Sequence, residues 1–491
     1  MDIKIKPNSK TFKKLAEKNN LIVLSHKFYS DWFTPIAAYY NLKNKIKGDS
    51  FLLESVEGQE KVCRYSFLGF SPIETFKTKK DKVYTKTTKA FKIKKDPLDE
   101  LKRTMGRYKV APKENLRFFG GFVGYLGYDL IRFYEPVGKE LKDKISTFDS
   151  YLILPKYLII FDHLKKQIEI LNFVSIDKKS KLNKAYKDGV KNISKLYDQM
   201  IKIEPLPKLN FVKKNVKMKS NFKKADFIKI LKKAKKYIKE GDIIQTVISQ
   251  RFESNFSKDP FLAYRYLRIL NPSPYMFYLN FGKMNLAGSS PEMLLRVENH
   301  ELITHPIAGT RPRGKNEVQD QKLKGSLLAD KKERAEHIML VDLARNDLGR
   351  VAKKTTVNLP VFMSVEKFSH VMHIVSEVRA KIKKGQNLFS ALESCFPAGT
   401  VSGAPKVRAM QIINELEPDR RGVYAGSVGY FSFTNSLDTC IIIRTILFKN
   451  NKAYIQAGAG IVADSLPEKE YKETINKAKA QVKALELASG S

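Results

Sequence analysis

The sequence predicts a protein of the α+β class, because strand and helix patterns both occur and apolar residues suffice for a large core. Hydrophobic residues make up 43% of the 491 residues, which excludes a disordered chain. The region from about 20 to 175 is rich in strand patterns, whereas strand and helix patterns alternate from about 222 to the end. This length suits two or three ordinary domains or one large two-part enzyme.

The N-terminal part is expected to consist mainly of strands. Residues 119–128 interleave Gly with aromatic side chains, which indicates closely packed strands or a bend. A helix and then a linker are expected in the Lys-rich segment that contains Pro205 and Pro207. The strand candidates are apolar runs bounded by Gly, Pro and charged residues, at 21–25, 50–55, 64–69 and 151–161.

The C-terminal part contains three well-marked helix patterns. The first carries apolar residues at helical spacing, ends at Gly241 and is expected to have a cap at Ser220 or Asn221. The second covers 330–345, with Asp330 near its start. The last helix is expected to begin with a capping box and a proline in its first turn, formed by Ser465, Pro467 and Glu468.

The amino-acid composition limits which cellular compartment and which partners are expected. The three cysteines show neither metal-like spacing nor an even disulfide framework, so a reducing cytoplasm is expected. The first residues contain no apolar stretch typical of a secretory signal, and apolar runs are too short to cross a bilayer. No membrane association is therefore expected.

The formal net charge of +39 raises the question of nucleic-acid binding. The excess is mostly Lys and is spread through the N-terminal half and the joining segment, whereas Arg concentrates in the C-terminal half. No zinc finger, RNP-type aromatic motif or basic zipper is present. A solvated Lys-rich surface explains the charge, and no nucleic-acid partner is expected.

Two acidic helix segments, more than a hundred residues apart, are the most informative feature of the chain. Glu333 and Glu336 are three residues apart, as are Glu470 and Glu473, so each pair shares one helix face. Lys477 lies one turn further along the second helix. Brought together, the two faces would form a site for a hard cation such as Mg²⁺. Two solvated surface helices are the alternative.

Four further motifs carry possible chemistry, although each alone also fits a structural role. The turn 306–313 ends in Thr310 and two arginines and could hold a carboxylate. The Gly-rich stretch 456–461 follows a strand pattern and could offer exposed N–H groups. His373 lies in a strand-like run, and Glu292 lies at a strand start.

Together these segments resemble the chorismate-utilising enzymes, above all the anthranilate synthase component I family, whose members make anthranilate for tryptophan synthesis. The resemblance covers nearly the whole chain and is densest from about 222 to 480. It is carried by the ordered stretches DKKERAEHIMLVDLARNDLGRV, FPAGTVSGAPKVRAMQIINELEP, DTCIIIRT and QAGAGIVADSLPEKEYKET.

The resemblance implies an architecture and a division of the chain. The implied fold is α+β, with large antiparallel sheets packed orthogonally and helices outside. Residues 1–205 would form an N-terminal regulatory part, residues 206–221 a linker, and residues 222–485 the chorismate-binding catalytic domain.

The resemblance also implies roles for individual residues. Glu336 and Glu473 look like direct Mg²⁺ ligands, with Glu333 and Glu470 in support through bound water. Glu292 resembles the general acid that protonates the departing C4 hydroxyl, and His373 the imidazole that assists the ring chemistry. Substrate binding is implied for Thr310, Tyr424, Arg444, Gly458, Ala459, Gly460 and Lys477.

Two positions distinguish activities within the family. Members that add water to chorismate resemble one another in a Lys base where this chain has Gln245, which cannot deprotonate water, so ammonia is the expected nucleophile. Aminodeoxychorismate synthases, the alternative reading, carry a Lys where this chain has Ala308 and can attack the ring covalently. Both differences favour an Mg²⁺-dependent anthranilate synthase.

Ammonia and regulation are expected to involve other molecules. Cys395 lacks the glycine pattern of a nucleophile elbow, so a separate glutamine amidotransferase subunit, component II of anthranilate synthase, is expected to supply ammonia. Two segments resemble the family's feedback element, so L-tryptophan is expected to bind there as an inhibitor. The residues are Leu53, Glu54 and Ser55 in the first segment and Pro274, Tyr275 and Met276 in the second.

Overall fold

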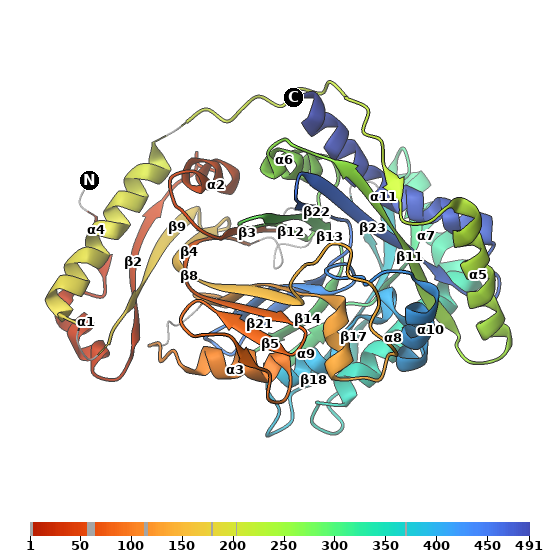
Figure 1. The fold of residues 1–491 in the computed structure, drawn as a ribbon, viewed down its shortest axis with the longest axis horizontal. Helices are drawn as coiled ribbons and strands as arrows, with labels where there is room; N and C mark the ends of the chain where they lie inside the picture. Colours follow the sequence, from red (N-terminus) through yellow and green to blue (C-terminus); the bar gives the residue numbers. More distant parts are fainter. Residues whose placement is uncertain (1–2, 56–63, 112–115, 178–179, 203, 369–370) are drawn as a thin grey trace.

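The computed structural model describes residues 3–55, 64–111, 116–177, 180–202, 204–368 and 371–491. Long strands form the centre of the molecule and helices lie outside them (Figure 1). Every pairing between the labelled strands is antiparallel. The α+β class with large antiparallel sheets and external helices is therefore confirmed.

The N-terminal part consists mainly of strands, with helices between some of them. The N-terminal part contains β1 (Ile5–Lys6), α1 (Ser9–Ala16), β2 (Leu21–Tyr29), α2 (Pro35–Lys43), β3 (Ser50–Glu54), β4 (Tyr65–Lys79), β5 (Lys82–Thr85), β6 (Phe91–Lys92), α3 (Pro97–Gly106), β7 (Gly121–Leu126), the 3₁₀ helix η1 (Tyr128–Phe133), β8 (Ser150–Asp162), β9 (Gln167–Ser175) and α4 (Leu182–Ile201).

The remaining elements are mostly runs of consecutive strands separated by helices. The middle of the chain contains β10 (Lys219–Ser220), α5 (Lys224–Lys239), β11 (Gln245–Asn255), α6 (Pro260–Leu270), β12 (Tyr275–Phe281), β13 (Met284–Ser290), β14 (Met293–Glu298), β15 (Glu301–Thr304), β16 (Ile307–Pro312), α7 (Glu317–Ala329) and α8 (Lys331–Gly349). The last part contains β17 (Asn358–Lys367), β18 (Val371–Lys381), α9 (Leu388–Cys395), η2 (Gly399–Val401), β19 (Gly403–Ala404), α10 (Lys406–Leu416), β20 (Ser427–Ser432), β21 (Leu437–Ile441), β22 (Thr445–Lys449), β23 (Lys452–Ile461) and α11 (Pro467–Gly490).

Two sheets share the long strands β4 and β8. The first sheet has the order β2-β9-β8-β4-β3-β12-β13-β22-β23-β11. The second runs from β8 through β7, β20, β21, β14 and β15 to β18, which also pairs with β16 and β17. One half of β8 pairs with β9 and the other with β7, and the β4–β8 register shifts between Pro72 and Glu74. This break lets the two strands leave one sheet and enter the other.

Two large apolar cores lie on opposite faces of the first sheet. In β12, Phe277 and Leu279 belong to the core that also contains Val123 and Leu152 of the second sheet. Met276 and Tyr278, the intervening residues, belong to the core that contains residues of α2, α6 and α11. The period of two in a strand therefore places one set of side chains between the sheets and the other beneath the outer helices.

The predicted linker falls where the structure has no helix or strand. Residues 204–218, between α4 and β10, form neither, and in Figure 1 they cross toward the C-terminus. Tyr266 of α6 donates to the carbonyl of Asn210 at 2.5 Å, so the segment lies against α6. The strands of the N-terminal part nevertheless pair with later ones, β3 with β12 and β7 with β20. The division at 205 and 222 stays a prediction.

Two helix caps that were predicted from the sequence are wrong. Helix α5 begins at Lys224 without a side-chain cap, so the predicted cap at Ser220 or Asn221 is wrong. Helix α11 begins at Pro467 with Leu466 as its N-cap, so no capping box forms there. The Ser465 hydroxyl instead accepts from the backbone N–H of Val462 at 3.1 Å.

Two motif segments that were not predicted as strands lie in strands. Residues 456–460 lie within β23 and pair with β11, so they do not follow a strand. Residues 307–312 form β16, whose register against β18 shifts around Gly309. Gly309 has φ +68°, a conformation that favours glycine. Pairing with a distant strand therefore overrides the local sequence pattern in both places. No helix in the described residues is long and apolar enough to cross a membrane.

Candidate active site

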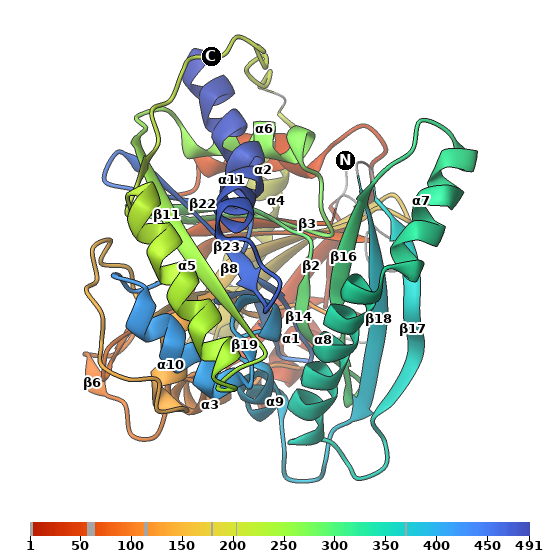
Figure 2. The same cartoon turned by 90° about the vertical axis from the view of Figure 1, so that its right-hand side faces the viewer.

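Helix α8 presents the first pair of acidic residues toward β16. Asp330 caps the helix by accepting from the N–H groups of Lys332 and Glu333 at 3.0 and 3.2 Å. Arg311 of β16 donates to Glu333 at 3.1 Å and to Asp330 at 2.8 Å. Figure 2 shows α8 lying alongside β16 and β18. The Arg311 guanidinium, which was predicted as a possible partner of a substrate carboxylate, therefore binds protein carboxylates and fixes the start of α8.

Helix α11 carries the second acidic pair together with a lysine. The Lys477 ammonium lies 2.7 Å from a Glu473 oxygen and donates to the Gly458 carbonyl at 3.0 Å. Burial acts to raise the pKa of Glu473, but Lys477, Glu470 and Arg444 together hold it below its ordinary value. Burial raises the pKa of Glu470, helped by the negative charge of Glu473. The two carboxylates are thus closely spaced, with Glu470 buried and Glu473 partly exposed.

The acidic faces of α8 and α11 approach each other. Burial raises the pKa of Glu336, and the neighbouring charges of Glu333 on its own helix and Glu473 on α11 raise it further. Carboxylates that repel one another in a sheltered place fit a hard divalent cation, which would relieve the repulsion. No group of three or more metal-binding side chains is already gathered within the part of the chain that the structure describes. Glu473 therefore lies near enough to Glu336 to affect its pKa, but the four predicted ligands are not gathered into one group in this structure.

The Gly-rich part of β23 lies beside these helices. A Cβ atom at position 458 would lie 2.8 Å from the Tyr424 hydroxyl oxygen, and one at position 460 would lie 2.5 Å from the Gln245 amide nitrogen. A Cβ at position 458 would also crowd Val247 and the Ile248 carbonyl, whereas at position 460 the Gln245 side chain would have to shift. Ala459 between them is fully buried. The two glycines leave room for Tyr424 and Gln245 to reach the strand.

Arg444 and Tyr424 lie close to the same strand. Arg444 has φ +52°, and its guanidinium donates to the Lys477 carbonyl at 3.3 Å. Burial lowers the pKa of Arg444 and raises the pKa of Tyr424 to about 12. Tyr424 is thus a neutral hydroxyl, and Arg444 a sheltered cation, next to Lys477 and Gly458. This arrangement suits a bound carboxylate.

Glu292 immediately precedes β14 and faces the same region. Burial raises the pKa of Glu292 to about 8, although Thr400 and Lys477 act in the opposite direction. The carboxyl group therefore carries a proton at neutral pH and can donate it. Thr400 was not predicted as a site residue. It lies in η2, within the stretch FPAGTVSGAPKVRAMQIINELEP that carries the family resemblance.

His373 on β18 and Thr310 on β16 are hydrogen bonded to each other. His373 Nδ1 lies 2.8 Å from the Gly309 carbonyl oxygen and 3.2 Å from the Thr310 hydroxyl. Burial lowers the pKa of His373, so the ring is neutral. Because Nδ1 must donate to the carbonyl, Nε2 is left with a lone pair that can accept a proton.

Gln245 begins β11 next to Gly460. Its side chain is 4% exposed, and in the described part of the chain no donor reaches its Oε1 atom. An unsatisfied buried carbonyl oxygen is unusual and indicates a place for a missing donor. The position at which water-adding members are expected to carry a lysine base thus holds a buried amide beside Gly460.

A cavity lies next to the paired strands β3 and β12, both of which precede the acidic helices in the sequence. Tyr264 donates to Glu54 at 2.8 Å, and Tyr275 donates to Asp438 at 3.0 Å. Met276 and Glu54 are register partners across the two strands. All six residues predicted for the feedback element line this cavity: Leu53, Glu54, Ser55, Pro274, Tyr275 and Met276.

The described cysteines are poorly suited to nucleophilic catalysis. Cys395 and Cys440 are both buried free thiols. Burial raises the pKa of Cys395 to about 12 and raises that of Cys440 as well. A nucleophilic cysteine requires a low pKa and access to solvent. Cys63 lies outside the described residues.

Comparisons with known proteins show which proteins this chain is similar to. Residues 48–483 match the sequence profile of the chorismate binding enzyme family. Anthranilate synthase component 1 of Aquifex aeolicus is 48% identical, over 98% of this chain and 97% of its own length. The corresponding protein of Acetivibrio thermocellus is 45% identical, over 98% of this chain and 99% of its own.

Two solved structures share the fold. The crystal structure of anthranilate synthase component I from Streptococcus pneumoniae superimposes with a TM-score of 0.77 and 38% identity, covering 92% of this chain and 98% of that chain. The menaquinone-specific isochorismate synthase MenF from Escherichia coli gives a TM-score of 0.74 at 21% identity, covering 97% of this chain and all of that chain. The second likeness concerns the fold alone.

Proposed function

The chain belongs to the chorismate binding enzyme family, and we propose that within it the chain is the synthase component of an anthranilate synthase. It would convert chorismate and ammonia to anthranilate, pyruvate and water. Relatives named anthranilate synthase component 1, similar over nearly the full length of both chains, support this activity. Ala308, in place of a nucleophilic lysine, speaks against the alternative of an aminodeoxychorismate synthase component I.

Chorismate carries two carboxylates, and the site offers two groups of partners for them. The enolpyruvyl carboxylate would bind Arg444, Tyr424 and Lys477 together with N–H groups of the 458–460 segment. The ring carboxylate would lie toward the acidic helices, with Thr310 beside it. Glu336 and Glu473 would hold Mg²⁺ directly, and Glu333 and Glu470 would support it through water. Bound there, Mg²⁺ would neutralise and orient the ring carboxylate.

The sheltered position of Glu292, which raises the pKa of its carboxyl group to about 8, carries the proposed chemistry. Ammonia adds to C2, the ring double bonds shift, and the C4–oxygen bond breaks. Glu292 gives its proton to the departing hydroxyl, which leaves as water. Loss of the C2 proton and cleavage of the C3–oxygen bond then release enolpyruvate, which takes up a proton to become pyruvate. The neutral His373 would assist this ring chemistry through its free Nε2.

Gln245 favours ammonia over water as the nucleophile. An amide cannot remove a proton from water, but its Oε1 can accept a hydrogen bond from ammonia, which needs no base to attack. The absence of a donor to Oε1 in the described part of the chain supports this role.

A separate glutamine amidotransferase subunit would supply the ammonia. The component 1 designation of the relatives implies a second component. The raised pKa of Cys395 also argues against glutamine hydrolysis by this cysteine. Glutamine hydrolysis by the purified chain alone would contradict this part of the proposal.

L-Tryptophan would bind in the cavity between β3 and β12 and inhibit the enzyme. The cavity combines aromatic walls, such as Tyr65 and Phe67, with the charged residues Glu54 and Arg296. Such a lining suits an amino acid that has both an indole ring and two charged groups.

The decisive experiment is anthranilate fluorescence from the purified chain with chorismate, Mg²⁺ and an ammonium salt at alkaline pH. The proposal expects a signal that EDTA abolishes and L-tryptophan reduces, without glutamine or a partner. Consumption of chorismate to another product would assign a sibling activity to the chain. Failure to consume chorismate, even with the amidotransferase subunit present, would overturn the proposal.

A further inference from the structure

Glu417 and Arg421 form a buried ion pair just beyond α10 that the proposed chemistry does not use. Their side chains are 3% and 1% exposed. The Arg421 Nε and Nη2 atoms donate to the two Glu417 oxygens at 2.9 and 2.7 Å. This is the two-pronged geometry that only arginine provides. A pair so far from water must be satisfied completely, because a lone buried charge is strongly destabilising.

The remaining hydrogen bonds of this pair go to segments that form the candidate active site. Arg421 also donates to the carbonyls of Val401 and Val247, both at 2.7 Å. Val401 follows Thr400, and Val247 lies two residues after Gln245. One guanidinium therefore joins η2, which lies beside Glu292, to β11.

Glu417 extends the connection to the Gly-rich strand. It accepts from the backbone N–H and the hydroxyl of Ser249, both at 2.8 Å. The Ser249 hydroxyl in turn accepts from the Gln456 amide at 2.8 Å, two residues before Gly458. The ion pair thus links α10, β11 and β23 around one point.

The Arg421 guanidinium also lies against two tyrosine rings. It is 5.5 Å from the ring centre of Tyr424 and 4.8 Å from that of Tyr128 in η1. A small cavity lined by Arg421, Thr445 and Gln456 adjoins Tyr424. Because side chains do not fill this space, the contact with the guanidinium restrains the ring where packing is incomplete.

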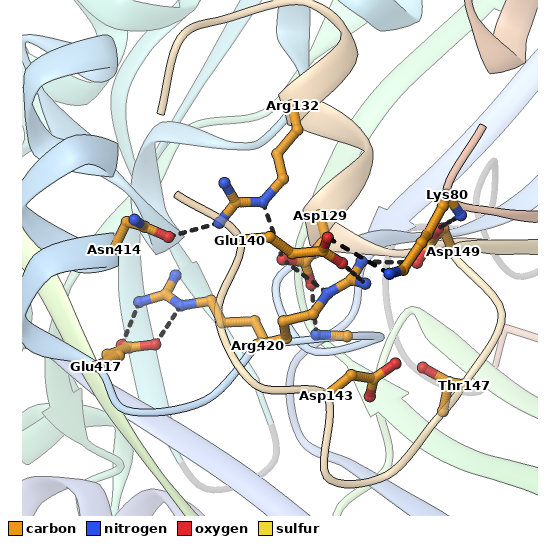
Figure 3. A network of polar contacts seen from close by, with 12 residues as sticks. Lys80, Asp129, Arg132, Glu140, Asp143, Thr147, Asp149, Asn414, Glu417 and Arg420 are labelled. Atoms are coloured by element: carbon orange, nitrogen blue, oxygen red, sulfur yellow. Dashed lines mark hydrogen bonds and ion pairs between the residues drawn. The ribbon is translucent and has the colours of Figure 1, made fainter. Parts of the chain in front are cut away.

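Arg420, the preceding residue, makes contacts of a different kind. Its guanidinium lies 2.8 Å from Glu140, 2.7 Å from Asp149 and 3.4 Å from Asp129. Figure 3 shows Arg420 directed to this acidic group, away from Glu417. Adjacent buried arginines thus serve different purposes, Arg420 joining the segment to the N-terminal part and Arg421 contacting Tyr424.

We propose that Arg421, oriented by Glu417, is a positioning residue that fixes the Tyr424 hydroxyl for the enolpyruvyl carboxylate of the substrate. The inference rests on the proposed function, since Tyr424 contacts chorismate only in that proposal. Arg421 itself touches neither substrate nor metal. Its contribution should therefore appear in substrate binding and depend on the Tyr424 hydroxyl.

The test is a double-mutant cycle between Arg421→Lys and Tyr424→Phe, read out by calorimetric chorismate binding and by KM. Lysine keeps the positive charge beside Glu417, but it cannot donate through two parallel N–H groups to that carboxylate or stack on the Tyr424 ring. We expect Arg421→Lys to raise the chorismate Kd and KM about tenfold, with kcat changed less than about threefold. In the Tyr424→Phe background, the same substitution should change neither Kd nor KM by more than about twofold.

Arg420→Lys is the matched control, because it alters an equally buried neighbour. It should lower the melting temperature while leaving the chorismate Kd within about twofold of the parent value. Equal weakening by both lysine variants, or an undiminished effect of Arg421→Lys without the Tyr424 hydroxyl, would overturn the inference.

A milder variant covers the case in which Arg421→Lys does not fold. Tyr128→Leu removes one ring from the guanidinium and should raise the chorismate Kd about threefold, again only when Tyr424 is present. No change in Kd would contradict the inference. Because binding is measured without turnover, a parent protein that binds chorismate but forms no anthranilate would refute the proposed activity and not the positioning role.

Discussion

The Lys477 ammonium lies 2.7 Å from a carboxylate oxygen of Glu473, one turn away on α11, and so pairs with a group that the proposed Mg²⁺ would need as a ligand. The same ammonium donates to Gly458 on β23. The helix and the strand are therefore joined by one cation.

A substitution at Lys477 should separate metal binding from substrate binding. Lys477→Gln removes a positive charge that competes with Mg²⁺, so Mg²⁺ alone should raise the melting temperature at lower concentrations than in the parent. The KM for chorismate should rise about tenfold or more, because a charged partner of its carboxylate is lost. Lys479→Gln, an exposed change on the same helix, should alter neither quantity. Weaker stabilisation by Mg²⁺ in Lys477→Gln would contradict the competition.

The proposed metal site predicts a strong difference between Glu336 and a glutamate that lies outside the site. Glu336→Gln should lower kcat/KM by at least about a hundredfold and shift half-maximal activity to higher Mg²⁺ concentration, because one cation ligand is lost. Glu468→Gln on α11 is the control, since that side chain is exposed and forms an ion pair with Lys224, at 3.0 Å, outside the proposed site. Mg²⁺ titrations of activity in EDTA-treated protein provide the measurement, and equal responses of the two variants would exclude the proposed ligand set.

Glu292 should determine the alkaline limit of catalysis. Its pKa is raised to about 8, so kcat/KM for chorismate at constant free ammonia should fall as pH rises through about 8. Glu292→Gln should lower kcat/KM by about a hundredfold to ten-thousandfold, since the proton donor is gone. A pH profile that remains flat to pH 9 would rule out this residue as the acid.

The same residue should also affect stability in a pH-dependent way. Between the ordinary pKa of 4.5 and about 8, the folded protein holds a proton that the unfolded chain has released. This contribution to the free energy of unfolding therefore decreases as pH rises through that window and is lost above it. Glu292→Gln should consequently melt at a higher temperature than the parent at pH 9. A lower melting temperature would contradict the assigned burial of the charge.

Gln245 should contribute to activity at the expense of stability. Gln245→Leu removes a buried oxygen that has no donor in the described residues, so the free energy of unfolding should rise by about 1 kcal/mol. Ammonia-dependent anthranilate formation should fall by at least about tenfold, because the acceptor for the nucleophile is lost. Chemical denaturation and fluorescence assays of one preparation would test both effects, and unchanged activity would remove Gln245 from the site.

The tryptophan cavity predicts a variant that is active but insensitive to the inhibitor. Ser55→Phe places a large ring in the cavity between β3 and β12, so L-tryptophan should no longer inhibit at concentrations that halve the parent activity. The kcat without tryptophan should change less than about twofold, since β3 carries none of the proposed catalytic residues. Full sensitivity to tryptophan in the variant would refute the assignment of the cavity.

The sequence by itself determined much of this protein because helix periodicity is a local property. The spacing of Glu333 with Glu336, and of Glu470 with Glu473, follows from 3.6 residues per turn wherever the helices lie. The ordered motifs also identified the family, since residue types around a reacting centre are chemically constrained. The helices α8 and α11 and the main strands accordingly formed where they were expected.

Only the tertiary structure decided how distant segments meet. The pairing of β3 with β12, which borders the cavity proposed for L-tryptophan, joins residues more than two hundred positions apart. The raised pKa of Glu292 and the isolation of Gln245 Oε1 depend on burial, which the local sequence does not encode. Arg421 looked like one of many arginines until folding placed its guanidinium against Glu417 and Tyr424. Local patterns fix which chemical groups a segment offers, whereas long-range packing fixes their partners and their solvation.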